Sequence, residues 1–70
     1  MNINTLVKMA NNIGAFFNSE PNREDGVKGV ETHLRNAWEP RMKKAIIAHV
    51  DAGHGDDLMD IVTEAVKRLK

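Results

Sequence analysis

Residues 4–18 read NTLVKMANNIGAFFN, and this stretch sets the expectation for the whole fold. At 100° per residue its apolar side chains fall on one face, made of Leu6, Met9, Ala10, Ile13, Phe16 and Phe17. Polar side chains fall on the opposite face, which carries Lys8, Asn11, Asn12 and Asn18. The pattern predicts an amphipathic helix with Asn4 or Thr5 as its N-cap. Gly14 inside it costs up to about 1 kcal/mol relative to alanine, and reflects either close approach of another backbone or a tolerated defect.

Three more helices are predicted, over residues 23–37, 40–52 and 57–69. Each has an apolar stripe at helical spacing. The stripes are Val27, Val30, Leu34, Ala37 and Trp38, then Met42, Ala45, Ile46, His49 and Val50, and finally Leu58, Ile61, Val62, Ala65, Val66 and Leu69. No segment alternates as a strand does. The predicted fold class is therefore all-α, a small bundle of three to four short helices forming one domain over residues 1–70.

The predicted helix ends rest on a few residues with known positional preferences. Pro21 stops the first helix, and Pro40 suits the first position of the third. Gly53 is expected just beyond the end of the third helix, where a left-handed residue is common. Asp56 or Asp57 is expected to cap the fourth.

Composition excludes several classes of function. The 70-residue chain has no cysteine, which rules out disulfides and Cys-ligated zinc or iron–sulfur centres. Ten basic residues balance ten acidic ones, so no overall field attracts nucleic acid or anionic lipid. No stretch approaches the roughly 18 apolar residues of a membrane span, and the start lacks a signal peptide pattern. The expected compartment is the cytoplasm.

Catalytic and metal-binding patterns are not found either. His33 and His49 show no ligand spacing and are expected as core or interface residues. His54 lies near three aspartates that lack Ca²⁺-loop spacing, so a role in the turn is expected. The single serine, Ser19, has no neighbouring base, and no phosphate-binding loop is present. Binding to DNA through the basic start of the third helix is the least favoured alternative, because the net charge is zero.

The informative residues are apolar. Phe16, Phe17 and Trp38 all stand at helix ends, where they serve either as core anchors or as contacts for a partner. Ile47 is expected to project from the polar side of the third helix, between Lys43 and Asp51. Because so small a chain buries only about 60% of its unfolded surface, these residues favour a partner-binding surface.

Two segments go beyond a generic helical pattern. The first is LVKMANNIGAFF, residues 6–17, and the second is HLRNAWEPRM, residues 33–42. They resemble the delta subunit of the bacterial NAD-dependent, molybdenum-containing formate dehydrogenases, which shows a Met-Ala-Asn-x-Ile-x-x-Phe-Phe pattern and then a His, an aromatic pair and Asp-Pro-Arg-Met. Ala37 replaces the first aromatic of the pair. Glu39 replaces the usual aspartate, which makes a weaker cap for the helix that Pro40 begins.

The resemblance implies a non-catalytic accessory subunit that supports complex stability or molybdenum-cofactor loading. It implies that the molybdenum cofactor, iron–sulfur clusters, FMN and NAD lie in partner subunits, and that this chain binds none of them. The most favoured partner is the molybdenum-binding large subunit. The alternative is a free-standing interaction module that forms a homo-oligomer.

The residues expected at the protein interface are Asn11, Phe17, Trp38, Arg41 and Met42. For Trp38 and Phe17, a position in the core is an equally weighted alternative to the interface. For Asn11, the alternative is an ordinary solvent-exposed surface residue. Arg41 has an alternative as the partner of a nearby carboxylate such as Glu39. No catalytic, cofactor-binding or metal-binding residue is expected in this chain.

Overall fold

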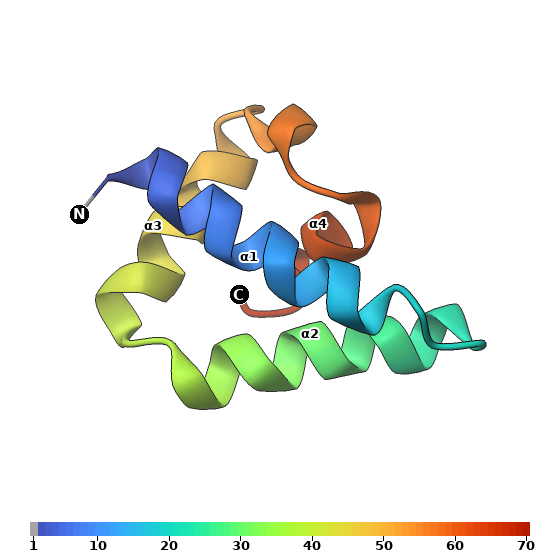
Figure 1. The fold of residues 1–70 in the computed structure, drawn as a ribbon. Coiled ribbons are helices and arrows are strands. Elements are labelled where there is room, and N and C mark those ends of the chain that lie inside the picture. Colours follow the sequence, from blue (N-terminus) through green and yellow to red (C-terminus); the bar gives the residue numbers. More distant parts are fainter. Residues whose placement is uncertain (1) are drawn as a thin grey trace.

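The computed structural model describes residues 2–70, which form four α-helices. These are α1 (Ile3–Phe17), α2 (Arg23–Ala37), α3 (Pro40–Asp51) and α4 (Asp60–Lys67), with a 3₁₀ helix, η1 (Gly55–Asp57), before α4. In Figure 1, α1 crosses the front of the molecule above α2, with α3 on the left. The described chain contains no strand, so the all-α prediction is confirmed. None of its helices is both long enough and apolar enough to cross a membrane.

The core lies where α4 meets the other three helices. Its members come from every helix and from the segment before α4, and each is less than a tenth exposed. They are Leu6, Val7, Ala10, Val27, Val30, Leu34, Trp38, Ile46, Leu58, Ile61, Val62, Ala65 and Val66. The predicted stripe of the fourth helix is confirmed almost entirely, with Leu69 only partly buried. In α2, Ala37 was predicted in the stripe but is exposed, because it faces outward in the last turn.

The start of α2 and both ends of α3 are set by nearby residues, and of these Pro40 and Gly53 take the positions that were predicted. Asn22 accepts hydrogen bonds from the backbone N–H groups of Glu24 and Asp25 at 2.8 and 3.3 Å. At α3, Pro40 occupies the first turn and Glu39 makes no side-chain cap. Gly53 has φ of 86°, and the His54 and Gly53 N–H groups donate to the carbonyls of His49 and Val50. This is a Schellman ending, which satisfies carbonyls that the helix leaves free.

Helix α1 begins one residue earlier than predicted, and the side that it buries overlaps the predicted face only in part. Asn2, rather than Asn4 or Thr5, is the N-cap, and its side chain accepts from the Asn4 N–H at 2.8 Å. Val7 and Gly14 are buried, whereas Met9 is 39% exposed and Phe16 is 72% exposed. At Gly14 the absence of a side chain lets α1 approach Val62 of α4 closely. Leu6 and Ala10 are buried as predicted, and Ile13 and Phe17 are partly buried against the core.

Helix α3 is buried over a wider arc than its periodicity predicted. Only Ile46 is fully buried, but Ile47 is partly buried and packs against the core instead of projecting into solvent. The cause is that α3 contacts both α1 and α4, so side chains on two of its sides meet neighbours. The expectation of an exposed Ile47 was wrong, and this residue gives no support to a partner surface.

Helix α4 is shorter than predicted, spanning Asp60–Lys67 rather than residues 57–69. Leu58 and Met59 have extended backbone and lead from η1 into the helix. Leu58 is buried in the core, which holds this segment against the bundle. Neither Asp56 nor Asp57 caps α4; both lie in η1, and Met59 stands at the N-cap without a side-chain cap.

An ion pair ties the start of α2 to the end of α4. Arg68 donates from both terminal nitrogens to the Glu24 carboxylate, at 2.6 and 2.9 Å. The hydrogen bonds from Arg68 lower the pKa of Glu24 below its usual 4.5. Because the folded state holds the charged carboxylate more firmly than the unfolded state, the stabilisation is present above pH 4.5 and is lost as the pH falls through the folded pKa.

Glu24→Gln is therefore expected to destabilise the chain near neutral pH and to have little effect once the pH is well below 4.5. The measurement is urea unfolding of both proteins at a series of pH values. Glu20→Gln is the control, because Glu20 is exposed and takes part in no ion pair between residues 2 and 70. A stability difference for Glu24→Gln that stays constant down to pH 3 would argue against this pairing.

Candidate functional site

The residues predicted at an interface are distributed over separate parts of the molecule. Trp38 is only 5% exposed and belongs to the core at the end of α2, which confirms its alternative as a core residue. Met42 is partly buried against the same core, and Arg41 beside it is exposed. Arg41 forms no ion pair with Glu39 or with any other described residue. Of these three, Arg41 presents the most surface to a partner.

Asn11 makes contacts within the chain. Its side-chain amide donates to the Asp57 carbonyl at 2.8 Å and accepts from the Met59 N–H at 2.9 Å. These two bonds join the middle of α1 to the extended segment before α4. They hold in place the extended backbone of Leu58 and Met59, which precedes the start of α4 at Asp60.

Asn11→Ala is expected to lower the free energy of unfolding by about 1 kcal/mol, because two hydrogen bonds are lost but water reaches part of the site. Chemical denaturation measures the loss. Asn12→Ala is the matched control: Asn12 is exposed and makes no hydrogen bond through its side chain among the described residues, so its effect is expected within about 0.5 kcal/mol. Equal effects of the two substitutions would contradict the role of Asn11 in joining α1 to the segment before α4.

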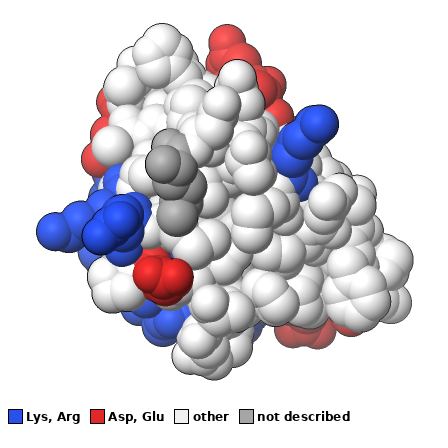
Figure 2. All heavy atoms as spheres, turned by 60° about the vertical axis from the view of Figure 1, so that its left-hand side comes forward, with Lys and Arg blue, Asp and Glu red and all other residues white. Residues whose placement is uncertain are grey.

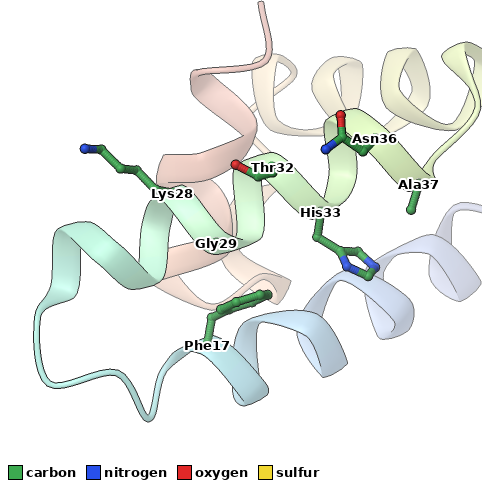
Figure 3. A pocket seen from close by; sticks show the side chains of 7 residues that line it. All are labelled: Phe17, Lys28, Gly29, Thr32, His33, Asn36 and Ala37. Atoms are coloured by element: carbon green, nitrogen blue, oxygen red, sulfur yellow. The ribbon is translucent and has the colours of Figure 1, made fainter.

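Phe17 is half-buried at the end of α1 and leans on α2. Gly29 lies directly against its ring, so close that a Cβ at this position would overlap the ring atoms. Figure 3 shows the Phe17 ring beneath Gly29 and the His33 ring farther along the same side of α2. Phe16 meets the Phe17 ring edge-on, with centroids 5.1 Å apart. The glycine therefore seats one aromatic ring, which in turn supports the second.

Two hollows flank Phe17 and His33 on the outer side of α1 and α2. One, of about 350 Å³, is lined by Asn12, Ile13, Phe16, Phe17 and His33. The other, of about 520 Å³, is lined by Phe17, Lys28, Gly29, Thr32, His33, Asn36 and Ala37. Because the two share Phe17 and His33, they form one surface, named here the α1–α2 groove. Lys28 is the only charged residue that lines it.

The groove continues an uncharged surface on α1. No Asp, Glu, Lys or Arg occurs between Lys8 and Glu20, although charged residues make up 29% of the chain. With the left-hand side of Figure 1 brought forward, most of the visible surface is likewise uncharged, and the charged side chains stand mainly toward its margins (Figure 2). Exposed apolar side chains on such a helix are typical of a protein-binding surface.

Sequence reasoning left Phe16 open between a core anchor and a partner contact and did not include it among the predicted interface residues. The available signal was the charge-free run from Met9 to Ser19, since a helix face turned to water normally carries charged residues. Phe17 was predicted at the interface and does line the groove. The contacts of all five predicted residues with a partner stay a prediction.

The histidines take three different positions. His33 lies at the junction of the two hollows. The His49 side chain is 13% exposed, and its Nε2 lies 3.0 and 3.1 Å from the two carboxylate oxygens of Asp57. Its ring lies 5.7 Å from that of His54. Within residues 2–70, no three His, Asp or Glu side chains come together in a way that could hold a metal ion.

Comparison with known proteins identifies the family. The family model for the NADH-dependent formate dehydrogenase delta subunit FdsD matches residues 5–66. The match covers both segments of the sequence resemblance and extends through α3 and most of α4. Comparisons with curated proteins and with solved structures give no match. Since the family model spans most of the 70 residues, the chain belongs to the FdsD family of formate dehydrogenase delta subunits.

Proposed function

We propose that this chain is a non-catalytic accessory subunit of a cytoplasmic formate dehydrogenase and acts by binding another subunit of that complex. The observation that carries the proposal is the uncharged surface of α1 with Phe16 exposed on it. The Phe16 ring is 72% exposed, which is unfavourable because apolar surface stays in contact with water. A domain this small has little other burial to offset this, and burial of the ring by a partner removes it. The family match supports the identity of the complex.

The chemistry of formate oxidation is assigned to the partner subunits. A chain without cysteine has no thiolate for an iron–sulfur cluster, and no groove residue forms a phosphate cradle for a dinucleotide. The side chains of this subunit therefore do not fit the clusters or the molybdenum cofactor. We assign these groups, with FMN and NAD, to the other subunits, and the molybdenum-binding large subunit is the proposed contact.

Binding alone is enough to explain an accessory role. A subunit that binds only the assembled or cofactor-competent state of its partner stabilises that state by mass action, by about 2.7 kcal/mol at a concentration 100 times Kd. The same coupling can act in two ways. It can slow dissociation of the finished complex, or it can hold the large subunit in a form that accepts the molybdenum cofactor.

The test is to purify the formate dehydrogenase from cells with and without this chain. A tagged copy is expected to co-purify with the formate dehydrogenase subunits. Loss of the chain is expected either to lower the molybdenum content per large subunit or to speed inactivation on warming at unchanged molybdenum content. The first outcome assigns cofactor loading and the second assigns complex stability. Recovery of the tagged chain without any formate dehydrogenase subunit, while the enzyme is expressed, would refute the proposal.

A further inference from the structure

We propose that the α1–α2 groove receives an amphipathic helix from a partner subunit, with an uncharged apolar face turned into the two hollows. The inference rests on the proposed function and specifies where and how the partner binds. It is carried by three features of the groove, which are its apolar floor, its near absence of charge and its position between two helices.

The apolar floor is formed before any partner arrives. Gly29 seats the Phe17 ring, and Phe16 packs edge-on against it, so neither ring requires large reordering on binding. Ile13 extends the apolar surface toward the middle of α1. Preformed aromatic anchors of this kind bind with a small loss of conformational entropy, and they dominate the energetics of many interfaces.

The scarcity of charged residues in the groove determines which side of a partner helix can bind there. Lys28, which lines the larger hollow, is the single charged residue among all those lining the two hollows. A charged side chain buried elsewhere along the groove would lose its hydration without gaining an opposite charge. The bound face is therefore apolar and uncharged, and an acidic residue is accommodated only beside Lys28.

The shape of the groove favours a helix. Its walls are the sides of α1 and α2, and residues 2–70 offer no sheet edge to which an extended segment could add by backbone hydrogen bonds. A helix laid between two helices presents apolar side chains at intervals of three and four residues, which suits two adjoining hollows. Asn12, Thr32 and Asn36 line the hollows and supply the polar contacts that surround an apolar centre.

The affinity test uses the full chain and the formate dehydrogenase complex of the same cells, purified without this chain. Phe16→Ala and Ala37→Glu are each expected to weaken binding by about 30-fold, as removal or obstruction of an interface anchor does. Ala48→Glu is the matched control, because Ala37 and Ala48 are both exposed alanines in the last turn of a helix. It is expected to change Kd by about twofold or less. Circular dichroism confirms that each variant is folded.

The outcomes separate the inference from the proposed function. If the unaltered chain fails to bind the complex, the proposed function is refuted. If the unaltered chain binds, and Phe16→Ala and Ala37→Glu bind as tightly, the complex is the partner but the groove is not the site.

Cross-linking identifies the occupant. A photoreactive side chain is placed at Asn36, which lines the larger hollow and is exposed. Cross-links are expected on the uncharged face of one amphipathic helix of another formate dehydrogenase subunit. Cross-links between two copies of this chain would overturn the inference in favour of self-association. Cross-links to an extended or charged segment would overturn it as well.

Discussion

Trp38→Ala is expected to lower the free energy of unfolding by about 3–5 kcal/mol, the usual loss when a large buried aromatic side chain is removed. The Trp38 side chain is 5% exposed and fills the corner at which the chain leaves α2 for α3. A 70-residue domain has a total stability of only about 3–10 kcal/mol, at roughly 0.05–0.15 kcal/mol per residue. The Trp38→Ala protein is therefore expected to lose a large share of its stability, and to be partly unfolded at 37 °C if the unaltered chain lies at the low end of this range.

Urea unfolding followed by circular dichroism measures this loss, with Phe16→Ala as the control. Both residues are aromatic and stand at a helix end, but Phe16 is 72% exposed, so its substitution is expected to change stability by about 0.5 kcal/mol or less. Trp38→Ala is thus expected to lower the stability of the chain, whereas Phe16→Ala is expected to lower its affinity for the partner. If Trp38→Ala folded normally and lost affinity for the complex, Trp38 would be the contact that the sequence predicted.

The sequence predicted the first three helices closely, because their ends depend on local chemistry. Asn22, Pro40 and Gly53 act through their own backbone geometry and hydrogen bonds to residues nearby, and this information is contained in a few consecutive positions. The start of the fourth helix could not be predicted in the same way. The extended segment before it is held by hydrogen bonds to Asn11, which lies 46 and 48 positions away in the chain.

The burial of side chains was harder to predict than the helices themselves. An apolar stripe shows which side of a helix is apolar, but not which part of it a neighbour covers. In α1 the position of α4 decides this, so that Gly14 is buried and Phe16 is not. In α3, contacts with two helices bury Ile47 against the expectation. The candidate groove depends on the same packing and could not be assembled from periodicity.

Gly14→Val is expected to lower the free energy of unfolding by about 3 kcal/mol, at the upper end of the usual cost of overpacking. A Cβ at position 14 would overlap the Val62 side chain and lie 3.2 Å from the Met59 sulfur. Val62 is fully buried and packed on all sides, so it cannot move aside. The added methyl groups of valine increase the overlap, and α1 must separate from α4 to relieve it.

Ala15→Val is the control that isolates packing from helix propensity. The same side chain is introduced one position further along α1, where Ala15 is exposed, and the expected loss is only about 0.6 kcal/mol. Thermal and urea unfolding of both variants give the comparison. If Gly14→Val lost no more stability than Ala15→Val, α1 and α4 would be free to separate, and Gly14 would be a tolerated defect. A large difference establishes instead that the missing side chain is what permits α1 and α4 to meet.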